Sequence, residues 1–306
     1  MSTTTPRAVL KNAELEKTLV QDGIVTCDFL NAAELLKLKE IVRGLLQKGD
    51  SNDVYVKTTF LVTTFNNSST FKAAIFEQIN TFLQEKLATF LDNYVPLAIN
   101  IFDKNPDIGN GSVDIHQNPT FVQEPDFRSV SLWIPLQDVN INNGTLGVLR
   151  GSHEVLGRMR AGNMPDICTF IAKEFQEDWC EPIEIKGGQV AILDDSIIHW
   201  SYPNKSQGNR AAVQLVCIPK ESTPILYHYV EMEKEAKLDM YEADKKFYID
   251  YTSRHPPIGL KQIGSFPFRY KSLTAKDLID NVTPRNALFA QKIVTRKLPW
   301  WKKIFS

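Results

Sequence analysis

Between residues 95 and 218 the chain consists of short β-prone runs separated by turn-forming residues, and this pattern restricts the fold more than any other feature. Asn143-Gly144, Gly151 and Gly187-Gly188 provide turns between successive runs. Many short strands joined in this way predict antiparallel sheets that pack as a sandwich or barrel. The expected strands are residues 96–102, 112–117, 129–136, 146–149, 181–185, 189–193 and 211–218.

Helical patterns precede the strands. Residues 12–22 have helical spacing and stop at Gly23, a residue typical of a helix C-cap. Asn31 and Glu34 predict a capping box at the start of a second helix. Because helices and strands do not alternate, the pattern favours a mainly β fold buttressed by helices over a doubly wound fold. The other elements expected here are a strand at residues 24–27 and a helix at residues 69–91.

The region after Lys220 differs in character. Residues 231–246 are densely charged and predict a solvent-exposed helix with charge pairs along its face. The final Leu-Pro-Trp-Trp-Lys-Lys-Ile-Phe-Ser is basic and aromatic, and we expect a docked or frayed terminus rather than a membrane contact. The whole chain, residues 1–306, is expected to be a single domain with a core at about 12–220 and a helical C-terminal extension at 221–306.

Composition excludes several classes of function. The composition is typical of a globular protein, with 43% hydrophobic and 23% charged residues. The net charge of −1 does not favour nucleic acid or an acidic membrane as a partner. No apolar run approaches the roughly 20 residues of a transmembrane helix, and the first residues lack a signal-peptide core. We therefore expect a cytoplasmic protein; nothing indicates its oligomeric state. The four cysteines, expected to be buried reduced thiols, are Cys27, Cys168, Cys180 and Cys217.

Three residues with polar or metal-binding side chains lie in or beside the expected strands. His116 begins His-Gln-Asn, His199 ends an apolar run, and Arg210 follows 11 residues after His199. Ferrous iron in oxygenases is bound by two imidazoles and one carboxylate, and a His-x-Asp pair on a strand places two such ligands on one face. An arginine at the start of a neighbouring strand can bind a dicarboxylate through two N–H groups. The pattern predicts an iron site, in which Asn118 stands where an aspartate is expected.

The surrounding motifs resemble those of the phytanoyl-CoA dioxygenase family of iron(II)/2-oxoglutarate oxygenases. That family combines His-x-Asp, an apolar Trp-x-x-Leu strand, Asn-Gly, Gly-Ser-His, and His-x-Ser-x-x-Asn with a downstream Arg. The resemblance covers about residues 12–220. The matching residues here are His116 to Asn118, Trp133 to Leu136, Asn143-Gly144, Gly151-Ser152-His153, His199 to Asn204, and Arg210.

The resemblance implies a double-stranded β-helix, which is a jelly-roll or cupin-like core. It implies that His116, Asn118 and His199 bind Fe(II), and that Arg210 anchors the cosubstrate 2-oxoglutarate. It further implies that the protein uses O2 to oxidise an unactivated C–H bond of a small molecule, by hydroxylation, desaturation or oxidative cyclisation. His153 belongs to the Gly-Ser-His turn, and we expect a structural role for it. The residues that could line a substrate pocket are Phe121, Trp133 and Trp200.

Asn118 leaves four interpretations open, because a neutral amide next to a dication should cost several kcal/mol of metal affinity. Asn118 or water could complete the coordination. A neighbouring carboxylate could replace the missing one, and the candidates are Asp114, Glu124 and Asp126. The site could have lost its oxygen chemistry, leaving a non-catalytic ligand-binding domain. It could also bind a halide, as in a halogenase, although Asn is nearly as large as Asp and would crowd that ion.

A further class of protein is a metal-binding cupin that does not use 2-oxoglutarate. Such a site has no need for a buried guanidinium, so Arg210 argues against this interpretation.

Overall fold

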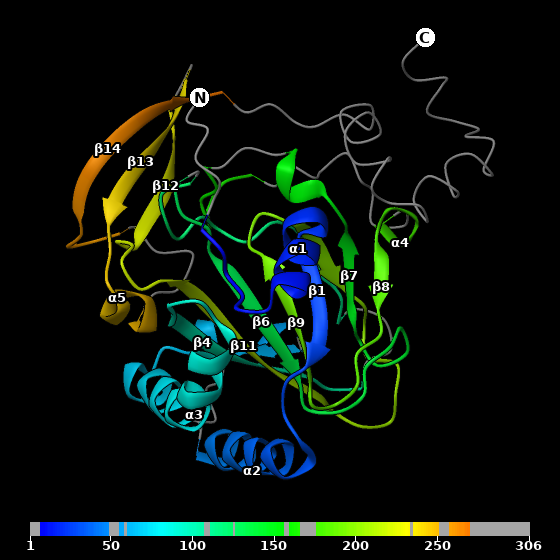
Figure 1. The fold of residues 1–306 in the computed structure, drawn as a ribbon. Helices are drawn as coiled ribbons and strands as arrows, with labels where there is room; N and C mark the ends of the chain where they lie inside the picture. The colour runs from blue at the N-terminus through cyan, green and yellow to red at the C-terminus, as the bar shows by residue number, and fades with distance from the viewer. Residues whose placement is uncertain are drawn as a thin grey trace, which may run out of the picture.

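Most of the chain can be described in the computed structural model. Within these residues the strands form three antiparallel sheets: a larger sheet of seven strands, a smaller sheet of four and a C-terminal sheet of three (Figure 1). The described residues are 7–48, 55–57, 60–106, 111–124, 126–155, 159–165, 176–232, 235–250 and 257–269.

The helices are short apart from two near the N-terminus. Their bounds are α1 Ala13–Asp22, α2 Ala32–Lys48, α3 Ser69–Phe90, α4 Gln176–Trp179 and α5 Lys245–Asp250, with 3-10 turns η1 Thr63–Phe65 and η2 Ser152–Glu154. The strands are β1 Ile24–Asp28, β2 Tyr55–Lys57, β3 Phe60–Val62, β4 Tyr94–Lys104, β5 Val113–His116, β6 Val130–Pro135, β7 Leu146–Leu149, β8 Glu181–Ile183, β9 Gln189–Asp194, β10 Ile198–Ser201, β11 Arg210–Pro219, β12 Ile225–Glu231, β13 Ala236–Glu242 and β14 Lys261–Phe268.

The order of the strands in each sheet determines which segments meet. The larger sheet has the order β1-β9-β6-β11-β4-β3-β2, and the smaller sheet has the order β5-β10-β7-β8. Side chains from both sheets pack together in one apolar cluster, with Trp133 and Leu193 from the larger sheet against Val148 and Ile183 from the smaller. The two sheets therefore face each other, and together they form the predicted double-stranded β-helix.

The central strands β9, β6 and β11 of the larger sheet are largely buried on both faces, and their side chains alternate between two environments. On β11, Val213 and Leu215 join the main hydrophobic core, whereas Arg210 and Gln214 line a cavity between the sheets. The same alternation holds on β4, β6 and β9, because successive side chains of a strand point to opposite faces. One face of this sheet thus builds the core, and the other face is available for polar groups.

Helices α2 and α3 cover the core face of the larger sheet (Figure 1). Their apolar stripes contribute Leu38, Val42, Ile75 and Leu83 to the cluster that includes Ile101 of β4. Burial of such side chains stabilises the fold by roughly 1.5–3 kcal/mol each. The helices therefore hold the sheet from outside and leave its inner face open to the cavity.

The predicted helix ends are confirmed. The Asn12 side chain caps α1, which ends at Gly23 with φ of 74°. In the capping box, the Asn31 N–H donates to Glu34 Oε2 at 2.7 Å and the Glu34 N–H donates to Asn31 Oδ1 at 2.9 Å. These ends are set by contacts between residues that are close in sequence.

The predicted helix at residues 231–246 is wrong, as is a helical C-terminal extension for the part of it that is described. Glu231 ends β12 and Ala236–Glu242 form β13, whereas only the last two of the residues described in this range are helical, at the start of α5; β14 completes the C-terminal sheet, which Figure 1 shows beside the core. In β13 the apolar residues Leu238 and Met240 are both buried and two positions apart, with Asp239, which is also buried, between them. This spacing fits a strand, and tertiary burial outweighed the helical preference of the charged residues.

Some predictions fall on residues outside the described ranges, including the aromatic C-terminus and Cys168. Cys217 is fully buried and Cys27 partly buried, as expected of thiols in a core, and Cys180 is buried as well. Among the described helices, none is long and apolar enough to cross a membrane.

Replacing Ile101 with Ala should lower the free energy of unfolding by about 2–5 kcal/mol, because the side chain is fully buried between the sheet and α3. Val95 of the same strand is 37% exposed, so Val95→Ala should cost less than about 1 kcal/mol. Urea unfolding followed by circular dichroism measures both values. Equal losses for the two variants would contradict the assignment of β4 to the core.

Candidate functional site

A cavity of about 770 Å³ lies between the larger and the smaller sheet. Its volume lies within the range of roughly 300–1,000 Å³ that is usual for small-molecule sites. All seven site residues that were predicted from the sequence line this cavity, although they are far apart in the chain. They are His116, Asn118, Phe121, Trp133, His199, Trp200 and Arg210.

The two histidines are brought together by strand pairing. β10 pairs with β5 so that His199 lies opposite His116, and the centroids of the two rings are 4.3 Å apart. Nδ1 of His116 lies 2.8 Å from the carbonyl oxygen of Asp114, and Nδ1 of His199 lies 3.0 Å from that of Ile197. A carbonyl oxygen only accepts, so each Nδ1 carries the proton and each Nε2 keeps its lone pair.

His199 is also held in its neutral form. Its side chain is buried, and burial lowers the pKa of His199 to about 3, with His116 contributing a smaller lowering. A neutral imidazole with Nδ1 bound to a carbonyl is the form in which histidine binds metal ions through Nε2.

Asn118 follows β5, and its side chain is held by Asp195, a residue that the sequence analysis did not predict to be part of the site. Its Nδ2 donates to Asp195 Oδ1 at 2.8 Å and to Ser131 Oγ at 3.3 Å. Its backbone N–H donates to the Asp195 carbonyl oxygen at 3.0 Å. Asp195 is fully buried, and burial raises its pKa to about 6, although Ser131, Asn118 and Ser129 lower it. The acidic pair Asp194-Asp195 inside an apolar run was the signal that sequence reasoning passed over.

The three carboxylates proposed as substitutes for an aspartate at position 118 differ in their surroundings. Asp114 is exposed but lines the cavity, whereas Asp126 is exposed and is not among the lining residues. Glu124 forms a paired contact with the buried Arg160, at 2.9 Å and 3.1 Å, and Arg160 Nε donates to the Asn118 carbonyl oxygen at 2.8 Å. Arg160 lines the cavity, so this ion pair helps to fix the segment around Asn118.

Arg210, the first residue of β11, presents a buried guanidinium to the cavity. Only 2% of the residue is exposed, and Nε and Nη1 donate no hydrogen bond within the described structure. The guanidinium carbon lies 5.4 Å from the centre of the Trp133 ring. Burial lowers the pKa of Arg210 to about 10, against a raising effect of Asp103, so the side chain remains charged at neutral pH. A buried cation with unused donors is suited to bind an anion.

Lys104 is a second buried cation beside Arg210, which it faces across the β4–β11 pair. Its Nζ donates to Ser201 Oγ and to the Tyr202 carbonyl oxygen, both at 2.6 Å. Gly144 lies against both cations: a Cβ there would be 3.2 Å from Lys104 Cδ and 3.5 Å from Arg210 Nε. The backbone at Gly144 also has φ of 89°, so the Asn-Gly turn can approach the cations only with a glycine at this position.

The two remaining aromatic candidates take part in packing as well as lining the cavity. Trp200 lies against Gly147, where a Cβ would be 2.0 Å from the indole nitrogen, and only 1% of Trp200 is exposed. Phe121 packs edge-on against Tyr248, with ring centroids 5.5 Å apart. Both help to form the walls that separate the cavity from the rest of the core.

His153 has the structural role that the sequence predicts. Its Nε2 lies 3.0 Å from the Val20 carbonyl oxygen, and its ring packs against Gly23 at the end of α1. The neighbouring Ser152 Oγ accepts a hydrogen bond from the Ile198 N–H at 2.8 Å, at the start of β10. The Gly-Ser-His turn therefore ties α1 and β10 together. His228 lies on β12, away from the cavity lining, and His255 is outside the described residues.

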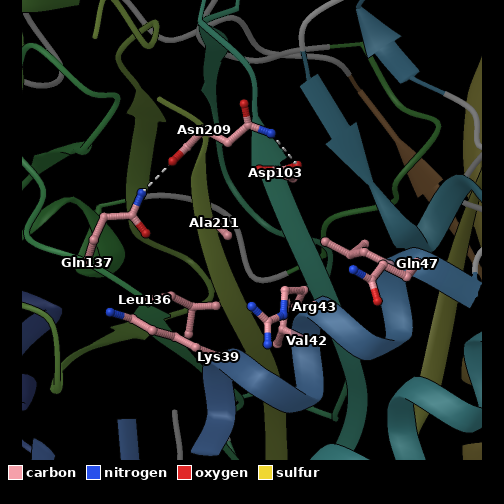
Figure 2. A pocket seen from close by; sticks show the side chains of 10 residues that line it. Lys39, Val42, Arg43, Gln47, Asp103, Leu136, Gln137, Asn209 and Ala211 are labelled. Carbon is pink, nitrogen blue, oxygen red and sulfur yellow. Dashed lines mark hydrogen bonds between the residues drawn. The ribbon is translucent and has the colours of Figure 1, made fainter. Parts of the chain in front are cut away.

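A second, shallower hollow of about 440 Å³ lies on the outer side of the larger sheet, against α2. Figure 2 shows Lys39 and Arg43 of α2 on one side, and the Gln137–Asn209–Asp103 hydrogen bonds on the other. It contains none of the nominated residues, so the cavity between the sheets is the candidate site.

Asn204 connects the end of β10 to the strands that carry the cations. Its Nδ2 donates to the carbonyl oxygens of Lys104 and Gly208, both at 2.8 Å, and its Oδ1 accepts from Ser206. Asn204→Ala should therefore lower the free energy of unfolding by about 2–4 kcal/mol, since several buried hydrogen bonds are lost. Asn142→Ala, in an exposed part of the adjacent turn, is the control. Equal effects in chemical denaturation would contradict this connecting role.

Comparison with known proteins identifies the family. The family description "Phytanoyl-CoA dioxygenase (PhyH)" matches residues 21–212, which is more than half of the chain. The phytanoyl-CoA dioxygenase domain-containing protein 1 homolog of Dictyostelium discoideum is 36% identical over 119 residues, covering 37% of this chain and 42% of that protein. Phytanoyl-CoA dioxygenase 1 of Oryza sativa subsp. japonica is 32% identical over 126 residues, covering 39% of this chain and 42% of that protein.

The matched stretch thus spans less than half the length of either relative. Among solved structures, the epimerase SnoN in complex with Fe3+, α-ketoglutarate and nogalamycin RO aligns with a TM-score of 0.50 and 18% identity, covering 69% of this chain and 84% of that chain. That likeness concerns the fold alone. The chain belongs to the phytanoyl-CoA dioxygenase family, within the iron(II)/2-oxoglutarate-dependent oxygenases.

Proposed function

We propose that this protein is a non-haem iron(II)/2-oxoglutarate-dependent oxygenase that oxidises an unactivated C–H bond of a small molecule. The observation that carries the proposal is the presence, in one cavity, of two facing imidazoles and a buried guanidinium with unused donors. The imidazoles suit a metal ion and the guanidinium suits a carboxylate. Membership of the family supports the same assignment.

The side chains of His116, His199 and Asn118 carry the types of donor atom that would hold a divalent iron ion. His116 and His199 would bind through Nε2, since their Nδ1 atoms are engaged by carbonyl oxygens. Asn118 would offer its amide oxygen, because its nitrogen is engaged by Asp195. Bound iron with 2-oxoglutarate would supply the activation of O2, with succinate and carbon dioxide as the products from the cosubstrate.

Arg210 would hold the far carboxylate of 2-oxoglutarate. Its unused Nε and Nη1 can each donate to a carboxylate oxygen, and Trp133 limits the movement of the guanidinium. Lys104 adds positive charge behind Arg210 and holds Ser201 at the cavity wall. Burial of both cations excludes water, which strengthens their attraction for an anion.

The remainder of the cavity would bind the substrate. Aromatic side chains form much of this lining, together with polar and charged residues such as Asn100, Asp114, Gln117 and Arg160. Such walls suit a molecule that has an apolar body and also polar groups. The position of its C–H bonds relative to the metal would decide between hydroxylation, desaturation and oxidative cyclisation. The aromatic residues of the lining are Phe60, Phe65, Phe102, Phe121, Trp133, Trp200 and Tyr248.

The halogenase alternative needs room for a halide beside the histidines. Asn118 is held at that position by hydrogen bonds to Asp195 and Ser131, so its side chain fills the space. The non-catalytic alternative is distinguished from the oxygenase by activity.

The direct test is formation of succinate from 2-oxoglutarate in the presence of Fe(II) and O2. We expect measurable succinate from the wild-type protein, and less than about one hundredth as much from His199→Ala, because the metal loses an imidazole ligand. His228→Ala, which removes a histidine outside the cavity, should retain the wild-type rate. If the wild-type protein yields no succinate and binds neither Fe(II) nor 2-oxoglutarate, the oxygenase function is wrong.

Binding of 2-oxoglutarate should depend on the inner guanidinium. Arg210→Ala should raise the Kd of 2-oxoglutarate, measured anaerobically with Mn(II), by at least about 30-fold, since a buried charge-assisted pair is lost. Arg43→Ala removes an exposed guanidinium from the outer hollow and serves as the matched control. If Arg43→Ala raises the Kd of 2-oxoglutarate more than Arg210→Ala does, 2-oxoglutarate binds in the outer hollow, and the assignment of Arg210 as its anchor is wrong.

A further inference from the structure

The orientation of the Asn118 side chain is determined by its neighbours. An ionised carboxylate can only accept hydrogen bonds, so the contact of 2.8 Å with Asp195 Oδ1 requires the amide nitrogen of Asn118 on that side. The amide oxygen is then directed away from Asp195. Within the described residues Oδ1 of Asn118 accepts no hydrogen bond, and Asn118 lines the cavity that contains both imidazoles. The Asn118 side chain therefore directs its acceptor Oδ1 toward the cavity and its donor Nδ2 toward the Asp195 carboxylate.

Asp195 is a buried carboxylate without a cationic partner in the described structure. Its Oδ1 accepts from Ser131 Oγ at 2.6 Å and from Asn118, whereas Oδ2 accepts no hydrogen bond of normal geometry. The neighbouring Asp194 differs, because it faces Arg128 at 3.4 Å. Burying an unpaired carboxylate is unfavourable by several kcal/mol, so a nearby positive charge would be strongly attracted. Asn118 and Ser131, which donate to Asp195, both line the cavity, so a cation bound there would be separated from this carboxylate by one side chain.

Ser131 and Gln214 extend this arrangement. Gln214 Nε2 donates to Ser131 Oγ at 3.1 Å, and Ser131 Oγ donates in turn to Asp195. Both residues lie on the inner face of the larger sheet, on β6 and β11. The chain of donors fixes the position of the Asp195 carboxylate, which in turn fixes Asn118. In the chain from Gln214 through Ser131 to Asp195 the hydroxyl both accepts and donates, so its two hydrogen bonds strengthen each other.

We propose that Asp195 supplies, through the Asn118 amide, the negative charge that the two-histidine site lacks at position 118. A carboxylate that accepts from an amide N–H draws the amide toward its charge-separated form, which places more negative charge on Oδ1. Asp195 thus acts as a positioning residue that both orients Asn118 and makes its oxygen a better ligand. This inference rests on the proposed function, because it requires a cation between the histidines and Asn118.

The test is Co(II) binding to the metal-free protein without 2-oxoglutarate, measured by calorimetry. Asp195→Asn keeps the shape of the side chain and removes its charge, so Co(II) affinity should fall by about 10- to 100-fold. The melting temperature of the metal-free Asp195→Asn variant should be unchanged or higher, since an uncompensated buried charge is removed. A merely structural role for Asp195 would give the opposite pair of results: a lower melting temperature and unchanged affinity.

The reciprocal exchange provides the control. The double variant Asn118→Asp with Asp195→Asn places the carboxylate next to the metal and the amide behind it, and should bind Co(II) at least as tightly as the wild type. Ser131→Ala removes a hydrogen bond to Asp195 but keeps the charge, so it should weaken binding less than Asp195→Asn. A double variant as weak as Asp195→Asn overturns the inference.

A measurement on the wild-type chain covers the case in which a variant fails to fold. In protein labelled with 15N-asparagine, Zn(II) should shift the side-chain NH2 signal of Asn118, assigned by its loss in Asn118→Asp. Zn(II) binding that leaves this signal unmoved overturns the inference alone, as does wild-type Co(II) affinity in Asp195→Asn. Absence of Co(II) and Zn(II) binding by the wild type overturns the proposed function together with the inference.

Discussion

The division of the larger sheet into two faces is the constraint on which the other features of this protein depend. β11 lies in the middle of that sheet, and its side chains alternate between the helix-covered core and the inner cavity. Val213 and Leu215 pack beneath the helices, so Arg210 and Gln214 must point inward. A shift of one residue in the register of β11 would bury the guanidinium in the apolar core and expose the core residues to the cavity. The site is therefore secured by hydrophobic packing on the opposite face.

The smaller sheet adds the proposed metal-binding side to this arrangement through the pairing of β10 with β5. Register alone places His199 opposite His116, and carbonyl oxygens on the same strands orient both rings. The charges in the cavity are also arranged by the strands. Arg210 and Lys104 lie on adjacent strands, and the carboxylate of Asp195 lies behind Asn118. The cavity thus has a cationic end suited to a carboxylate and an end with imidazoles and a buried carboxylate suited to a cation.

The sequence predicts local features well, because their causes are local. The Gly23 cap, the Asn31–Glu34 box and most of the strands follow from neighbouring residues. The C-terminal strands were missed because alternating charges also fit a helix, and only burial of Leu238 and Met240 decides between the two. Asp195 and Lys104 were missed for another reason: each acts through partners about 80–100 residues away, which no local pattern reveals. Motif resemblance recovered Arg210 and the histidines, since it carries that long-range information.

The measurement that most directly tests this account is a crystal structure grown anaerobically with Mn(II) and 2-oxoglutarate. We expect Mn(II) at about 2.0–2.3 Å from Nε2 of both His116 and His199, with the Asn118 amide oxygen facing the ion. We also expect the far carboxylate of 2-oxoglutarate to bind the Arg210 guanidinium. A metal bound away from the two histidines, or 2-oxoglutarate in the outer hollow beside α2, would contradict it.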